Sequence, residues 1–129
     1  MNTTNSPEVK SLIESFPEED RDAVSWHMQF EILRELRSIV ARENGSVSSV
    51  NKTWKKRYQE YIKSDVWKNR TDIMKRKFGN RCQVCNQSEK DITLHVHHRT
   101  YERLGLELPE DLTLLCKNCH LHHHREMEV

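Results

Sequence analysis

The placement of the cysteines constrains the fold of this sequence more than any other feature. The chain has 129 residues and four cysteines, which fall in two CxxC pairs, Cys82-Gln83-Val84-Cys85 and Cys116-Lys117-Asn118-Cys119. A CxxC turn presents two thiolates to one ion, and two such turns complete the tetrahedral shell of four sulfurs that Zn²⁺ prefers. We therefore predict one zinc ion held by all four cysteines. A closed shell of this kind leaves no position for a substrate, so the zinc is expected to be structural.

A redox-active CxxC is the alternative interpretation of either pair. That motif requires one pair at the start of a helix that follows a strand, whereas here two pairs bracket 30 residues. Hydrophobic residues make up 35% of the chain and charged residues 32%, so buried apolar surface alone gives a thin margin of stability. Because zinc binding would contribute folding free energy to such a domain, the metal site is favoured.

The length and the N-terminus limit the class of protein further. A chain of 129 residues has room for one compact domain with additional helices. No apolar run approaches the length that crosses a membrane, and MNTTNSPEVK lacks the basic start and hydrophobic stretch of a secretory signal. We therefore expect a cytoplasmic protein with no membrane partner. In a reducing compartment its cysteines should bind metal rather than form disulfides.

Helix signals fill the first 80 residues. Ser6-Pro7-Glu8 predicts a short helix to about Phe16, because a hydroxyl cap precedes proline and an acid. A second, long amphipathic helix is predicted to follow Pro17 and to end at Gly45. A third helix carries one apolar stripe, made of Trp54, Tyr58, Tyr61 and Ile62, and a fourth is predicted from Ser64-Asp65 to Phe78. The helical spacing of these aromatic residues favours a place in the core over a role in stacking on bases.

Charge is distributed unevenly along the chain. Residues 1–50 carry a balance of −4, residues 51–80 carry +7 and residues 81–129 carry −2, for a total of +1. A basic middle indicates a localised surface for a polyanion, although a solvated lysine-rich helix face is an equal alternative.

Small polar residues at 45–49 mark a hinge at the point where the charge changes sign. We therefore predict an acidic helical arm at 1–45, a basic helical lead-in at 46–80 and a core at 81–129. For the arm, the alternatives are self-association, contact with a protein partner, covering of the basic surface until DNA displaces it, and packing on the core.

The pattern changes after Cys85. Residues 92–98 alternate like a strand, residues 111–115 read as a second strand, and a final helix is predicted from Lys117. The segment between the strands has one glycine and one proline and is predicted to be a loop. The chain as a whole is therefore predicted to be α+β and mostly helical.

Histidines concentrate in the same C-terminal part, because seven of the eight follow residue 90. His120 and His124 are four residues apart on the predicted final helix, and this spacing suits chelation of one ion. The first strand offers His97 or His98 as a third ligand. Neighbouring residues on a regular strand point to opposite faces, so both could serve one site only if the strand ends or bends there.

These residues together resemble the HNH endonuclease family in its four-cysteine, zinc-bearing form, one of the ββα-metal nucleases. The resemblance is carried by RCQVC, VHHRTYERLGLE and EDLTLLCKNCHLHHH, and YQEYIKSDVWKNR resembles the helical lead-in of such proteins. It covers residues 58–124 and does not cover residues 1–50. It implies a ββα-metal finger with a structural four-cysteine zinc at 81–129, preceded by N-terminal helices.

The resemblance also implies roles for single residues. His98 matches the general base of the family, and His97, His120 and His124 match its metal ligands. Asp111 occupies the place of the asparagine that ties down a loop and so orients the base. This is a departure from the family, because aspartate accepts hydrogen bonds and cannot donate one as asparagine does.

The remaining polar residues of this segment are less defined. His95 is either a hydrogen-bonding partner of the metal ligands or exposed to solvent, and His123 competes with His124 for the ligand position. Tyr101, Arg103 and Glu107 belong to the family-like stretch, and we assign them only to loop packing or to contacts with phosphate.

The function implied is a metal-dependent endonuclease acting on double-stranded DNA. Its cofactors would be structural Zn²⁺ and a catalytic divalent cation, such as Mg²⁺, Mn²⁺, Ni²⁺ or Zn²⁺. Water activated by His98 would attack in line and leave 5′-phosphate and 3′-hydroxyl ends. By resemblance, small stand-alone nucleases of this form are often phage or mobile-element proteins, which for a phage protein implies the host cytoplasm.

A catalytically silent, zinc-stapled DNA-binding or interaction module is the alternative function. Asp111 favours the silent module, because it departs from the family's asparagine. The complete set of histidines favours catalysis, because a binding module would not require it. That set consists of His97, His98, His120 and His124.

Overall fold

The chain divides into two compact units in the computed structural model. Its backbone is described for residues 6–90 and 92–127, and its side chains for the same residues except 123–127. Unit 1 contains Met1–Trp67 and Leu104–Leu106, and unit 2 contains Lys68–Arg103 and Glu107–Val129. Within the described ranges, no helix has both the length and the hydrophobicity that crossing a bilayer requires.

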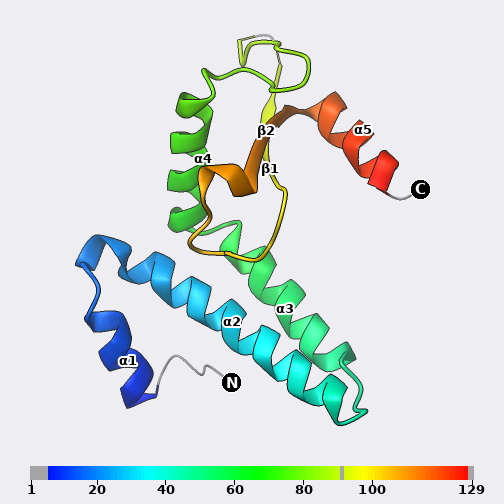
Figure 1. Cartoon of the computed structure of the whole chain (residues 1–129). Coiled ribbons are helices and arrows are strands. Elements are labelled where there is room, and N and C mark those ends of the chain that lie inside the picture. The colour runs from blue at the N-terminus through cyan, green and yellow to red at the C-terminus, as the bar shows by residue number, and fades with distance from the viewer. Residues whose placement is uncertain (1–5, 91, 128–129) are drawn as a thin grey trace. The chain divides into compact units, whose positions relative to one another are not determined.

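Helices make up most of the described part of unit 1 (Figure 1). It contains α1 (Pro7–Glu14), α2 (Arg21–Arg42), α3 (Ser48–Tyr61) and the first residues of α4 (Asp65–Lys77). The Ser6 hydroxyl accepts a hydrogen bond from the Val9 amide at 3.3 Å and caps α1, as its position before proline predicts. A 3₁₀ turn at Glu18–Asp20 leads into α2. This helix was predicted to end at Gly45 and ends at Arg42, and α2 and α3 pack against each other.

Aromatic side chains form the core of unit 1. The Tyr61 side chain is fully buried, and its ring centroid lies 5.4 Å from that of Trp26 and 5.8 Å from those of Phe30 and Trp67. Trp54 packs edge-on against Phe30, with ring centroids 5.9 Å apart. These rings bury large areas against one another, which stabilises a unit with few aliphatic core residues. Of the aromatic residues of α3 that were predicted to belong to the core, Tyr61 is buried, and Trp54 and Tyr58 are half-buried.

The short segment Leu104–Leu106 also packs in unit 1, although it comes from the loop between the two strands. Leu104 is buried, and its carbonyl oxygen accepts a hydrogen bond from His27 Nδ1 on α2 at 3.0 Å. Gly105 has φ +92°, and a Cβ added to it would lie 2.6 Å from the His27 amide nitrogen and 2.8 Å from the Ala23 carbonyl oxygen. Only glycine allows so close an approach of the two backbones.

Unit 2 combines a two-stranded sheet with helices. Most of α4 (Asp65–Lys77) belongs to it, together with β1 (Leu94–His98), β2 (Leu112–Cys116) and α5 (Lys117–Met127). The strands are antiparallel, with Leu94 opposite Cys116 and His98 opposite Leu112. Strand, strand and helix therefore follow one another as predicted, and the α+β, mostly helical fold is confirmed.

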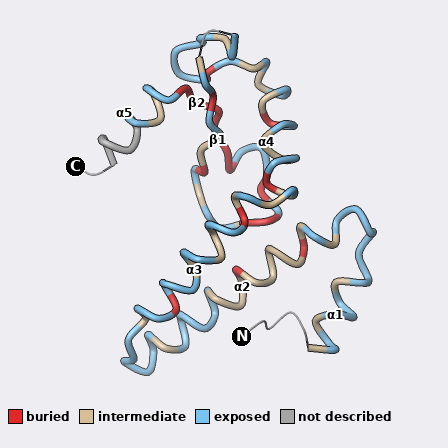
Figure 2. Tube along the Cα trace, turned by 180° about the vertical axis from the view of Figure 1, so that it is seen from behind, coloured by how far each residue is buried: buried red, intermediate tan, exposed pale blue. Residues whose placement is uncertain are grey.

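The sheet is the most buried part of unit 2. Every residue of β2 is buried, as Figure 2 shows in red, and β1 is buried at Leu94 and His98. Leu94, Leu114 and Leu115 form a small core with Cys82 and Cys116. The predicted second strand began at residue 111, whereas Asp111 closes a 3₁₀ turn at Pro109–Asp111 and the strand begins one residue later. The cysteines thus belong to the core as well as to a candidate metal site.

Gly105→Ala should destabilise the protein more than Gly79→Ala. Both glycines have positive φ, at +92° and +70°, but a Cβ at Gly79 would meet no atom within 4 Å. Gly79→Ala should therefore cost only the left-handed conformation, about 1 kcal/mol, and Gly105→Ala should cost about 1–3 kcal/mol more because the backbone of α2 cannot yield. Urea unfolding of both variants measures the difference. Equal midpoints would contradict the packing of Leu104–Leu106 against α2.

Candidate functional site

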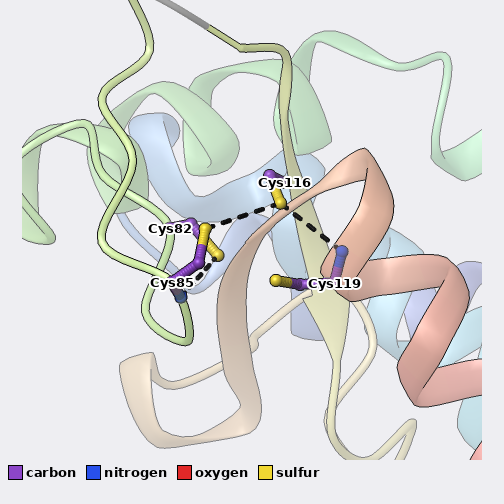
Figure 3. A group of neighbouring side chains, drawn as sticks. All are labelled: Cys82, Cys85, Cys116 and Cys119. Carbon is purple, nitrogen blue, oxygen red and sulfur yellow. Dashed lines mark hydrogen bonds between the residues drawn. The ribbon is translucent and has the colours of Figure 1, made fainter.

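The four cysteines converge on one point of unit 2, as Figure 3 shows. Their sulfur atoms all lie within 4.8 Å of one another, and Cys85 Sγ is 3.8 Å from Cys116 Sγ. Sulfurs around a tetrahedral zinc with Zn–S bonds of about 2.3 Å are about 3.8 Å apart. The donor set and its spacing therefore fit Zn²⁺, and the four predicted ligands are brought together.

Both CxxC pairs make the same local turn. The Cys85 amide donates to Cys82 Sγ at 3.5 Å, and the Cys119 amide donates to Cys116 Sγ at 3.4 Å. The first pair follows α4, while Cys116 ends β2 and Cys119 lies in the first turn of α5. A metal ion bound here would join the segment before β1 to the start of α5.

The thiols differ in how readily they ionise. Burial raises the pKa of Cys82, but hydrogen bonds from the backbone of Cys85, Cys116 and Val84 outweigh burial and lower it to about 6. The hydrogen bond with the Cys116 sulfur, together with burial, raises the pKa of Cys119 to about 12. One thiolate therefore forms easily at neutral pH and opposes the ionisation of the others. A cation would be needed to hold all four as thiolates.

A pair of histidines meets between β1 and α5. His97 Nδ1 lies 3.1 Å from His120 Nε2. Two nitrogen ligands of one ion, each at about 2.0–2.1 Å from it, are separated by about 2.9–3.4 Å. These two predicted ligands are therefore spaced for a shared metal ion. The side chain of the third predicted ligand, His124, and that of its competitor His123 lie outside the described residues, on the part of α5 one turn beyond His120.

His98 is held separately from the histidine pair. The ladder between β1 and β2 stays regular to its end at His98, so His97 and His98 point to opposite faces of the sheet. His98 is 6% exposed, and its Nε2 lies 2.8 Å from Glu107 Oε2. The Tyr101 ring packs beside it with a centroid distance of 5.3 Å. The two neighbouring histidines therefore have different surroundings and can do different chemistry.

Glu107 is a buried carboxylate that joins His98 to α4. Its side chain is fully buried, and Oε1 lies 3.2 Å from Arg70 Nε. Arg70 also donates from Nη1 to the Glu107 carbonyl oxygen at 3.0 Å. From the sequence we assign Glu107 only to loop packing or to contact with phosphate. Its pairing with Arg70 is not predicted, because the two residues are 37 positions apart in the chain.

Asp111 ties the ends of the loop between the strands. Its carboxylate accepts two hydrogen bonds from the Arg103 guanidinium and one from the Leu108 amide at 2.9 Å. Its carbonyl oxygen accepts from the Arg99 amide at 2.7 Å, directly after His98. The hydrogen bonds from Arg103 lower the pKa of the Asp111 carboxyl below its ordinary value, so the carboxylate stays ionised.

Residues 82–126 match the family model described as HNH endonuclease. This segment is an HNH domain. It runs from the first cysteine of the cluster onto α5 and includes both strands. No curated protein and no solved structure matches the chain.

The HNH domain contains every residue that we assign to a site from the sequence. The predicted HNH family is therefore confirmed for this part of the chain, its four cysteines lie close enough together to bind zinc, and the domain suggests a nuclease-type function. The roles of single residues and the predicted boundaries at 45 and 80 stay predictions.

Removal of one cysteine should remove the zinc and loosen the HNH domain. In Cys116→Ala we expect bound zinc to fall from about one ion per chain to near zero, because three thiolates no longer form the closed shell. Ser88→Ala is the matched control, since Ser88 lies close to the first CxxC pair and is no ligand. Elemental analysis of the purified variants measures the loss. Full zinc occupancy in Cys116→Ala would argue against the four-cysteine site.

Proposed function

We propose that the protein is a metal-dependent endonuclease that hydrolyses phosphodiester bonds in double-stranded DNA. The observation that supports this most is that His97 and His98, at the end of β1, have different partners. His97 lies 3.1 Å from His120, as two ligands of one metal ion would, while His98 on the other face is hydrogen-bonded to a buried carboxylate. A base and a cation are the two components that phosphodiester hydrolysis needs near neutral pH.

His98 would act as the general base. With its Nε2 proton donated to Glu107, a neutral imidazole carries its lone pair on Nδ1, which can accept a proton from water. The water oxygen attacks phosphorus in line, and the bond from phosphorus to the 3′ oxygen breaks. The 3′ oxygen takes up a proton and becomes a hydroxyl, and the phosphate remains on the 5′ end.

The candidate residues for the divalent cation are His97, His120 and, as predicted from the sequence, His124. A cation bound there would neutralise charge on the phosphorane and on the departing 3′ oxygen. Imidazole ligands suit Ni²⁺ and Zn²⁺ better than Mg²⁺, which prefers oxygen. We therefore propose Ni²⁺ or Zn²⁺ ahead of Mn²⁺ and Mg²⁺ as the catalytic metal.

A stripe of lysines on α3 supports DNA as the partner. Lys52, Lys55 and Lys56 share one helix face and are exposed. Among the residues that the structure describes, no carboxylate lies within ion-pair distance of these three. On α2, in contrast, Arg34 pairs with Glu31 at 3.2 Å and Arg42 pairs with Glu35 at 3.7 Å. The lysine stripe is therefore free to bind phosphates, which supply most of the affinity for duplex DNA.

A catalytically silent DNA-binding module is the second candidate function. One observation favours it: His98 is only 6% exposed, and a general base must reach water. The same zinc cluster and lysine stripe would serve such a module. The nicking experiment that follows separates the two candidates.

Plasmid nicking tests the catalytic proposal. The wild-type protein should nick supercoiled DNA with Mn²⁺ or Ni²⁺ and not with EDTA, and His98→Ala should reduce the rate at least about 100-fold because the general base is lost. His122→Ala, an exposed histidine on α5, is the control and should keep the rate. If His98→Ala nicks as fast as the wild type, the base is wrongly assigned. If the wild type nicks DNA with none of Mg²⁺, Mn²⁺, Ni²⁺ and Zn²⁺, the protein is better described as the silent DNA-binding module.

The lysine stripe predicts a change in the salt dependence of DNA binding. Replacement of Lys52, Lys55 and Lys56 by glutamine should reduce the slope of log K against log salt by about 3, because each lost phosphate contact contributes about 0.9. The control replaces Arg34 and Arg42, which pair with acids. Fluorescence anisotropy of a labelled duplex in the His98→Ala background measures both slopes. A slope equal to that of the control would contradict the stripe as a phosphate-binding surface.

A further inference from the structure

His98 is joined to a buried carboxylate, that of Glu107. The Glu107 side chain is 0% exposed and the His98 side chain 2% exposed, and the two are joined by the 2.8 Å contact from Nε2 to Oε2. An ionised carboxylate only accepts hydrogen bonds, so this contact requires a proton on Nε2. The lone pair of a neutral His98 is then on Nδ1, the atom to which the proposed mechanism assigns the proton of water.

Arg70 holds Glu107 at two points. Its Nε lies 3.2 Å from Glu107 Oε1, and its Nη1 donates to the Glu107 carbonyl oxygen at 3.0 Å. A carboxylate buried beside a neutral imidazole would be costly without a cation, and the guanidinium supplies one. Because Arg70 binds both the side chain and the backbone of Glu107, it fixes the direction in which Oε2 points. Arg70 comes from the middle of α4, a regular helix, so the support is rigid.

Asp111 is a second buried carboxylate of this loop. The resemblance implies that this position orients the base by fixing a loop. The Asp111 carboxylate does bind the loop, through Arg103 and the Leu108 amide, but the carboxylate on the His98 ring belongs to Glu107. The pair with Arg103 also explains why aspartate, and not asparagine, suits position 111, since only a carboxylate forms this charged contact.

We propose that Glu107 is a positioning residue for His98, and that Arg70 holds Glu107 in place. Glu107 would fix the plane of the imidazole ring and its Nε2–H tautomer, so that Nδ1 is directed at the attacking water. This inference rests on the proposed nuclease function.

The test compares Glu107→Gln with Glu110→Gln, an exposed acid three residues further along the chain. Glutamine has the shape of glutamate, but its amide can donate to Nε2 and so permits the other tautomer. We expect Glu107→Gln to lower kcat for nicking at least about 100-fold with little change in KM, because orientation of the base matters only to the chemical step. Glu110→Gln should keep the wild-type kcat. Arg70→Lys should lower kcat less, because lysine keeps the charge and loses the second contact.

Nitrogen-15 NMR of the histidine rings gives a readout that is independent of cleavage. In zinc-loaded wild-type protein at neutral pH, His98 should be the Nε2–H tautomer, and Glu107→Gln should shift it toward a mixture while Glu110→Gln does not. A wild-type His98 with its proton on Nδ1 would overturn the proposal, even if the Glu107 variant failed to fold. So would a Glu107→Gln protein with full zinc, the wild-type tautomer and the wild-type kcat. If the wild type nicks no DNA, the nuclease function fails, and the tautomer still decides whether Glu107 orients the ring.

Discussion

The convergence of two CxxC turns is the constraint on which the rest of the HNH domain depends. The turns bring four sulfur atoms within 4.8 Å of one another, so the segment before β1 and the junction of β2 with α5 meet at one point. With β2 buried along its whole length and paired with β1, the first turns of α5 are then fixed beside the outer face of β1. This is why His97 and His120, which are 23 residues apart, approach to 3.1 Å. A zinc ion in the cluster would stabilise this arrangement, because its binding free energy adds to the folding free energy of the domain.

Paired charges dominate the loop between the strands. Glu107 and Asp111 are both buried, and each is matched by an arginine, Arg70 for the first and Arg103 for the second. Buried ion pairs add little net stability compared with apolar packing, because desolvation offsets their attraction. The pair of Glu107 with Arg70 is better explained by the need to hold the His98 imidazole at the end of β1. The pair of Asp111 with Arg103 fixes the loop between the strands. Directly before Glu107, Leu104–Leu106 belongs to unit 1, where Leu104 is buried.

Local signals in the sequence predict most of the elements and the zinc ligands. Caps such as Ser6 before Pro7 locate the helices, alternation locates the strands, and CxxC spacing identifies ligands that are close in sequence. Contacts between distant residues are not predicted in this way. Glu107 looks like any acid of a polar loop, and only the fold shows that Arg70, 37 residues earlier, and His98 share its carboxylate. Likewise, nothing in the pattern around Gly105 indicates that this glycine meets the backbone of His27 on α2.

Mn²⁺ binding with and without zinc tests whether the cysteine cluster positions the histidines for a second metal. Electron paramagnetic resonance titration should show one Mn²⁺ site in protein loaded with one equivalent of zinc, and loss of that site after the zinc is removed. In His97→Ala, the Mn²⁺ site should be lost while the zinc stays, because the dependence runs in one direction only. Mn²⁺ binding of equal affinity in the zinc-free protein would show that the histidine site does not depend on the cysteine cluster.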